Sequence, residues 1–194
     1  MAYETYFNML LNIGLLVLIA ALLTNLEFVR DLFLEEQGSL FSKTALAVIF
    51  GVISIVSTYT GTRTDGAIIN TRVIGVLAAG LLGGPYVGML TALIAGLHRY
   101  LFDIGGFTAV SCAVSTLFEG ILGSAFSTRF KSGKMKQIGI FALTAVAEVA
   151  QMVIILLISR PFVDAVHLVQ RIAVPMILMN SCGCLLYTSD AADE

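Results

Sequence analysis

The sequence predicts an all-α integral membrane protein, a bundle of six or seven transmembrane helices that contains one hairpin of two short helices. First, 58% of the residues are hydrophobic and only 12% are charged, a composition outside the range of soluble globular domains. Second, several uncharged stretches reach the roughly 20 residues that a helix needs to cross a bilayer. Third, a glycine-rich stretch from Asn70 to Glu119 is broken halfway by Gly83-Gly84-Pro85.

The uncharged stretches define the expected spans. Four of them lack Asp, Glu, Lys and Arg altogether: Thr5–Leu26, Thr44–Thr62, Val73–His98 and Ile172–Ser189. Two more are each interrupted by a single glutamate: Gly105–Thr128 and Gln137–Ser159. The first stretch is expected to remain as a helix rather than to be cleaved, because it has no basic start and Thr24-Asn25-Leu26 is not a small-x-small cleavage site.

The stretch Val73–His98 admits two interpretations. As one helix it would be about 39 Å long, too long for a hydrocarbon core of about 30 Å without strong tilt. Proline breaks the helical hydrogen bonds and glycine lowers the cost of a reversal. We therefore favour two short helices, Gly66–Gly83 and Pro85–Tyr100, after a polar link at Thr60–Asn70. A single kinked helix is the alternative.

The later helices follow from similar signals. We expect helices over Phe107–Thr128 and Gln137–Ile158, the second ended by Arg160-Pro161, and a last helix that begins near Leu168–Arg171. A basic cluster separates the first two helices: Arg129, Lys131, Lys134 and Lys136. Such clusters favour the cytoplasmic side. Counting basic residues does not choose between six and seven spans, but only seven place Arg72, Arg99 and Thr108–Ser115 together near the outer leaflet.

Two arginines flank the central stretch. A guanidinium is always charged and its planar fork matches a carboxylate, so Arg72 and Arg99 are candidates for holding a small organic anion. Two other interpretations remain open. The arginines can extend to the membrane interface, or they can pair with Glu119, Glu148 or Asp103.

A polar face follows on the next expected helix. Its members recur at helical spacing: Thr108, Cys112, Ser115 and Glu119, with Ser111 at the border. These hydroxyls can orient a ligand, or they can bond to their own backbone and to neighbouring helices. Glu119 and Glu148 fit structural ties better than proton relays, because no polar chain joins them.

Other classes of site have no support in the sequence. Cys112 and Cys182 fall inside apolar spans, so we expect no disulfide, and no Cys/His spacing is typical of a metal site. We find no catalytic motif, no cofactor motif and no basic tract for nucleic acid. Membrane lipid and a small ligand are the expected partners.

Several ordered motifs resemble the membrane sensor region (5TM-5TMR type) of LytS-type histidine kinases. The quoted segments are Asn70-Thr71-Arg72, Gly80-Leu81-Leu82-Gly83-Gly84-Pro85, Gly96-Leu97-His98-Arg99-Tyr100, Gly106-Phe107-Thr108-Ala109, Ser111-Cys112-Ala113-Val114-Ser115-Thr116, Glu119-Gly120, Ala147-Glu148, Gln151-Met152, Arg160-Pro161, Asp164-Ala165-Val166 and Asn180-Ser181. The resemblance covers about residues 5–183 and is strongest for the pyruvate-responsive branch.

The resemblance implies a multi-pass receptor in a bacterial inner membrane. It implies a full-length homodimer that continues into a histidine kinase, and the kinase would phosphorylate a LytTR-type response regulator. It also implies that a pyruvate-like carboxylate binds to Arg72, Arg99, Cys112 and Ser115. From their positions in the sequence, Thr108, Ser111, Glu119 and Glu148 are the residues that we expect to support this site. A looser similarity, to substrate-binding subunits of energy-coupling-factor vitamin transporters, leaves a small-solute permease or transporter subunit as the alternative.

The C-terminal residues 184–194 depart from the family pattern. They read Cys-Leu-Leu-Tyr-Thr-Ser-Asp-Ala-Ala-Asp-Glu and resemble translated adapter or cloning sequence, which carries no information about the fold. We therefore expect a sensor domain over residues 1–183 with its last helix cut short, and a foreign tail over residues 184–194.

Overall fold

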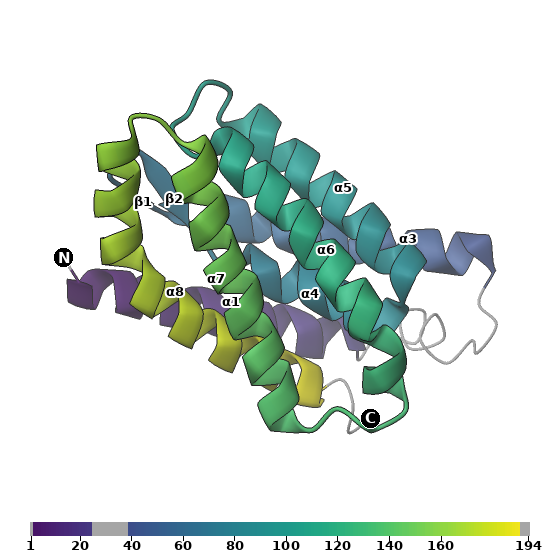
Figure 1. The fold of residues 1–194 in the computed structure, drawn as a ribbon. Coiled ribbons are helices and arrows are strands. Elements are labelled where there is room, and N and C mark those ends of the chain that lie inside the picture. The colour runs from purple at the N-terminus through teal and green to yellow at the C-terminus, as the bar shows by residue number, and fades with distance from the viewer. Residues whose placement is uncertain (1, 25–38, 191–194) are drawn as a thin grey trace.

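The computed structural model describes residues 2–24 and 39–190, and within them it is helical apart from one small hairpin (Figure 1). The helices are α1 (Ala2–Thr24), α3 (Leu40–Tyr59), α4 (Arg72–Gly83), α5 (Pro85–Phe102), α6 (Ala109–Lys131), α7 (Gln137–Ile158) and α8 (Phe162–Asp190). By length and composition, α3, α6, α7 and α8 can cross a membrane, whereas α4 is a shorter apolar helix. The chain is thus a multi-pass helical membrane protein. The count of six or seven spans stays a prediction.

The helical hairpin turns where the sequence indicates. Helix α4 ends at Gly83 and α5 begins at Pro85. Gly84 between them has φ +86, a left-handed conformation that glycine adopts at low cost, and proline is well suited to the first position of a helix. The two-helix interpretation is confirmed, and the single kinked helix is wrong.

The start of the hairpin differs from the prediction. Instead of a helix from Gly66, strand β1 (Thr62–Thr64) pairs antiparallel with β2 (Ala67–Ile69). The turn residues Asp65 and Gly66 both have positive φ, as a type I′ β-hairpin turn requires. The Asp65 carboxylate accepts two hydrogen bonds, of 2.8 and 2.6 Å, from Arg171 Nη1 on α8. This β-hairpin leads directly into α4.

Helix α4 lies in the middle of the bundle. Its residues from Arg72 to Leu81 are all buried, and it packs against α3, α5, α6 and α8. Small residues allow this close approach: a Cβ added at Gly80 would lie 2.6 Å from the backbone of Gly123 on α6. Backbone-to-backbone packing therefore holds α4 to α6.

The last helix is longer at both ends than expected. Helix α8 begins at Phe162, before the predicted start near Leu168–Arg171, and continues without a break to Asp190. Cys184 and Tyr187 are buried, and the Tyr187 ring lies 6.4 Å from that of Phe50. Helix α8 thus extends past Gly183, and the truncation of the sensor domain at that point stays a prediction. The adapter origin of residues 184–194, of which 191–194 lie outside the described part, stays a prediction.

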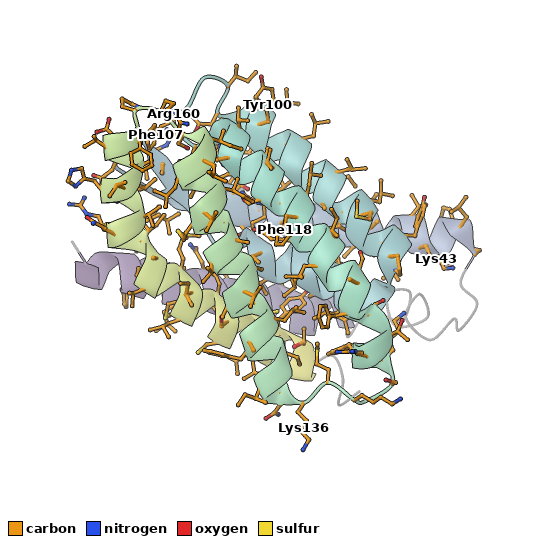
Figure 2. All side chains as sticks on the ribbon, viewed as in Figure 1. Lys43, Tyr100, Phe107, Phe118, Lys136 and Arg160 are labelled. Atoms are coloured by element: carbon orange, nitrogen blue, oxygen red, sulfur yellow. The ribbon has the colours of Figure 1, made fainter. Side chains whose placement is uncertain are left out.

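The two ends of the bundle differ in charge. Lys136, in the α6–α7 turn, lies at the opposite end of the molecule from Arg160 and Phe107 (Figure 2). The α6–α7 turn therefore forms a distinctly basic end, which the sequence assigns to the cytoplasm.

Replacing Gly80 by alanine tests the role of this packing. The new methyl group would meet α6 backbone, which cannot move as a flexible side chain can, so Gly80→Ala should lower the free energy of unfolding by about 1–3 kcal/mol. Thermal unfolding of the purified protein measures the change. Gly14→Ala in α1 is the matched control, because no atom lies within 4 Å of the added Cβ. Equal melting temperatures for the two variants would contradict the packing account.

Candidate functional site

Arg72 is the first residue of α4 and is 2% exposed. Its backbone N–H donates to Asn70 Oδ1 at 3.1 Å, which satisfies one of the free donors at the helix start. Its side chain reaches α6, where Nε donates to Thr116 Oγ1 at 2.9 Å and Nη2 donates to the Cys112 carbonyl oxygen at 3.4 Å. The third nitrogen, Nη1, is buried and has no hydrogen-bond partner.

Arg99 lies in the last turn of α5 and is fully buried. Its Nη1 donates to Asp103 Oδ2 at 3.2 Å and its Nη2 donates to Thr108 Oγ1 at 3.1 Å. Nε is buried without a partner. Asp103 is therefore the acid that pairs with this arginine, one of the alternatives that the sequence left open.

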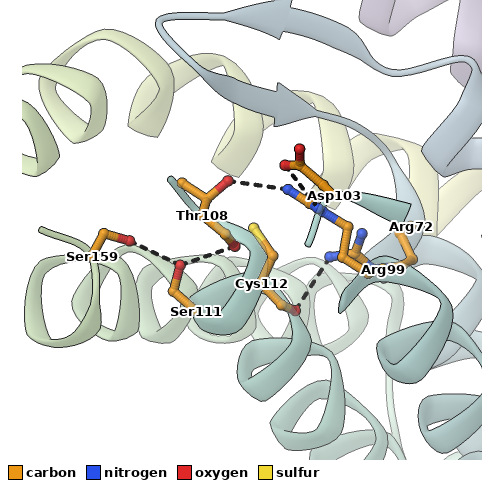
Figure 3. A network of polar contacts seen from close by, with 7 residues as sticks. All are labelled: Arg72, Arg99, Asp103, Thr108, Ser111, Cys112 and Ser159. Atoms are coloured by element: carbon orange, nitrogen blue, oxygen red, sulfur yellow. Dashed lines mark hydrogen bonds and ion pairs between the residues drawn. The ribbon is translucent and has the colours of Figure 1, made fainter. Parts of the chain in front are cut away.

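The burial of both guanidinium groups bears on another alternative. Arg72 and Arg99 are each at most 2% exposed, so neither guanidinium extends to the surface of the bundle, as a side chain that reaches for the membrane interface would. Figure 3 shows the two side chains next to each other and turned toward the start of α6, where Arg99 contacts Thr108 and Arg72 contacts the Cys112 carbonyl. Each keeps one N–H group free of protein partners. A buried unpaired donor is costly, and a carboxylate oxygen would satisfy it.

The polar face of α6 bonds mostly to its own backbone. The Cys112 carbonyl accepts from Ser115 Oγ at 3.0 Å and from Thr116 Oγ1 at 2.7 Å, in addition to Arg72. Ser111 Oγ donates to the Thr108 carbonyl at 3.2 Å and lies 3.0 Å from Ser159 Oγ at the end of α7. The structure thus brings Thr108 to Arg99 and Cys112 to Arg72, while Ser115 joins the cluster through Cys112.

The two intramembrane glutamates lie deeper along α6 and α7. Glu148 Oε1 accepts a 2.7 Å hydrogen bond from Asn180 Nδ2 on α8, and the same nitrogen donates to the Asn70 carbonyl at 3.4 Å. Both oxygens of Glu119 are buried without a partner, but the charges of Arg72 and Glu148 interact with it. Glu148 is a structural tie between α7 and α8, as the sequence favours.

Sequence reasoning did not name three residues of this network as site residues, although each lies in one of the quoted motifs. Thr116 falls outside the helical stripe yet supplies the partner of Arg72 Nε. Asn70 caps α4 and Asn180 joins α8 to α7. A signal existed for Asn180, because an asparagine inside an apolar span is costly unless bonded. Within the described residues, no group of three or more His, Cys, Asp or Glu side chains can hold a metal ion.

The arginine cluster is closed in this structure. A cavity of about 540 Å³ opens near it, lined by Asp65, Phe107, Asp164, His167 and Arg171. Neither arginine reaches that cavity, although Phe107 directly precedes Thr108, the partner of Arg99.

Comparison with known proteins places the chain in a family. The family model described as 5TMR of 5TMR-LYT matches residues 26–194. The sensor histidine kinase BtsS of Escherichia coli K12 is 46% identical over 152 residues, which cover 76% of this chain and 27% of that protein. The sensor protein LytS of Bacillus subtilis 168 is 39% identical over 202 residues, 93% of this chain and 33% of that protein.

A third relative is more distant. The sensor histidine kinase YpdA of Escherichia coli K12 is 30% identical over 180 residues, 91% of this chain and 32% of that protein. No solved structure matches the chain. The chain spans about a third or less of the length of these relatives. It belongs to the 5TMR-LYT family, the membrane sensor region of LytS-type two-component histidine kinases.

Proposed function

We propose that this sensor region binds a small extracellular carboxylate such as pyruvate at Arg72 and Arg99. One observation carries the proposal: two buried guanidinium groups each have an N–H group without a protein partner. A carboxylate presents two acceptor oxygens and one negative charge, which suits that arrangement. In this proposal Cys112 and Ser115 complete the binding site. The residues that support the site are Thr108, Ser111, Glu119 and Glu148.

The hydrogen-bond partners of Arg72 support an anion as the ligand. Arg99 is paired with Asp103, whereas Arg72 bonds only to a hydroxyl and a carbonyl oxygen through its side chain. The side-chain hydrogen bonds of Arg72 therefore all go to neutral groups. In a low-dielectric interior, an arriving carboxylate gains more from such a cation than it would in water.

The basic end of the bundle supports entry from the outside. Lys136 lies opposite Phe107 and Arg160 (Figure 2), and basic loops favour the cytoplasm. The α5–α6 connection, Asp103–Thr108, then lies on the outer side. In the full-length protein α8 would lead toward the kinase, which would act as a homodimer on a LytTR-type response regulator.

A route for the signal follows from the contacts of Asn70. Its side chain caps α4 at Arg72, and its carbonyl accepts from Asn180 on α8. A ligand that draws Arg72 toward itself would change the position of α8 through these contacts. Binding shifts such an equilibrium only by its difference in affinity for the two arrangements.

Arginine variants test the binding site. Arg72→Ala and Arg99→Ala should each weaken pyruvate binding to the purified protein about tenfold to a hundredfold, since a hydrogen bond to a charged group contributes about 1.5–3 kcal/mol. Arg72→Lys should fall between wild type and alanine, because it keeps the charge but loses the fork. Calorimetric titration gives the affinities.

Arg63→Gln is the matched control, because Arg63 is exposed in β1. Its affinity should equal that of the wild type. Unchanged affinity in both arginine-to-alanine variants would remove the proposed site. Accumulation of labelled pyruvate in sealed vesicles that contain the protein would favour the permease or transporter-subunit alternative instead.

Asn180→Leu tests the connection to α8. The change leaves the buried Glu148 carboxylate and the Asn70 carbonyl without their shared donor, so the free energy of unfolding should fall by at least about 1–3 kcal/mol. Thr58→Val is the control, because the hydroxyl of this buried threonine bonds only to its own helix, at Ser54 O. Thermal unfolding distinguishes the two. A melting temperature of Asn180→Leu no lower than that of the control would show that this contact does not tie α7 to α8.

A further inference from the structure

A groove opens at the basic end of the bundle, far from the arginine cluster. It lies between the end of α6 and the start of α7, has a volume of about 540 Å³ and is closed at one end by the connecting turn. Its lining residues are Leu122, Phe126, Arg129, Lys134, Met135, Lys136, Ile138, Gly139, Ala142, Leu143 and Val146. A volume of this size is typical of a pocket for a small molecule.

The groove has two chemically distinct parts. Its mouth carries three cations, Arg129, Lys134 and Lys136, and no carboxylate is among its described lining residues. In the stretches that the structure describes, no acid forms an ion pair with any of the three. Its walls are apolar, with Phe126 from α6 and Val146 from α7. The site therefore suits a molecule with an anionic head and an apolar tail.

The position of the groove matches the depth of a lipid. Helices α6 and α7 can both cross a membrane, so their ends at Lys131 and Gln137 lie near its boundary. The cations of the turn then lie at headgroup level, where lysine and arginine are favoured. The apolar walls lie at the level of the acyl chains, and Val146 and Ile138 are largely exposed on this surface.

We propose that this groove is a binding site for one anionic phospholipid. The phosphate lies between Arg129 and the two lysines, and one acyl chain runs along Phe126, Ala142 and Val146. Arg129 is held over Phe126, with its guanidinium carbon 5.8 Å from the ring centroid, so it stands where headgroup and chain meet. A zwitterionic headgroup fits less well, because no carboxylate in the lining would receive its cation.

The cavity at the opposite end does not share this chemistry. It contains Asp65, Asp164 and Arg171, and Arg171 is already paired with Asp65. An anionic headgroup would meet two carboxylates there. The proposed lipid site is thus specific to the α6–α7 end, and it does not depend on the proposed carboxylate site.

Native mass spectrometry of the detergent-purified protein tests the proposal. Phosphatidylglycerol and phosphatidylcholine with the same acyl chains are added at equal concentrations. We expect the wild type to retain one phosphatidylglycerol with at least about tenfold preference. The triple variant Arg129→Gln, Lys134→Gln, Lys136→Gln should lose that preference. The charge-conserving variant Arg129→Lys, Lys134→Arg, Lys136→Arg should retain the lipid, which separates charge from a general effect on folding.

Two further arms identify what is bound. Ala142→Phe fills the apolar part of the groove and leaves every charge in place, so retention should fall, whereas Arg160→Gln at the other end should have no effect. Far-ultraviolet circular dichroism confirms that each variant is folded. Equal retention of the two lipids, or full retention by the triple glutamine variant, would overturn the proposal. Competition by glycerol 3-phosphate as strong as by lipid would show a site for free phosphate esters and would also overturn it.

Discussion

The buried charge of Arg72 is the constraint on which the site depends. A guanidinium cannot lose its proton, so the bundle must provide acceptors at the point where α4 begins. The carbonyl of Cys112 and the hydroxyl of Thr116 provide them, both on α6. That contact fixes the position of α4 along the axis of α6. It also places the start of α6, with Thr108 and Ser111, beside Arg99 and Ser159.

Small residues make this polar contact possible. A guanidinium reaches a neighbouring helix backbone only where the two helix axes come close, and Gly80 and Gly123 allow that approach between α4 and α6. The glycines of the central stretch therefore contribute both to the chemistry of the site and to the packing of the bundle.

The features that sequence reasoning predicted depend on composition and local backbone chemistry. The apolar stretches gave the helices, and Gly84-Pro85 gave the turn between α4 and α5. The β-hairpin before α4 was missed, because Asp65-Gly66 was interpreted as a simple link although such a pair also favours a tight strand turn. The sequence does not determine which partner each arginine takes. Arg99 pairs with Asp103 and not with the glutamates. Thr116 is within reach of Arg72 only because α4 and α6 cross at this point.

The exposed ion pair between Asp65 and Arg171 is sensitive to salt, unlike the contacts of the buried arginines. Both side chains are about half exposed, at 44% and 51%, so dissolved salt screens their attraction. The arginines inside the bundle are shielded from such screening. Because Asp65 lies on the hairpin that leads into α4 and Arg171 lies on α8, the strength of this connection between the two elements depends on the ionic strength of the surrounding medium.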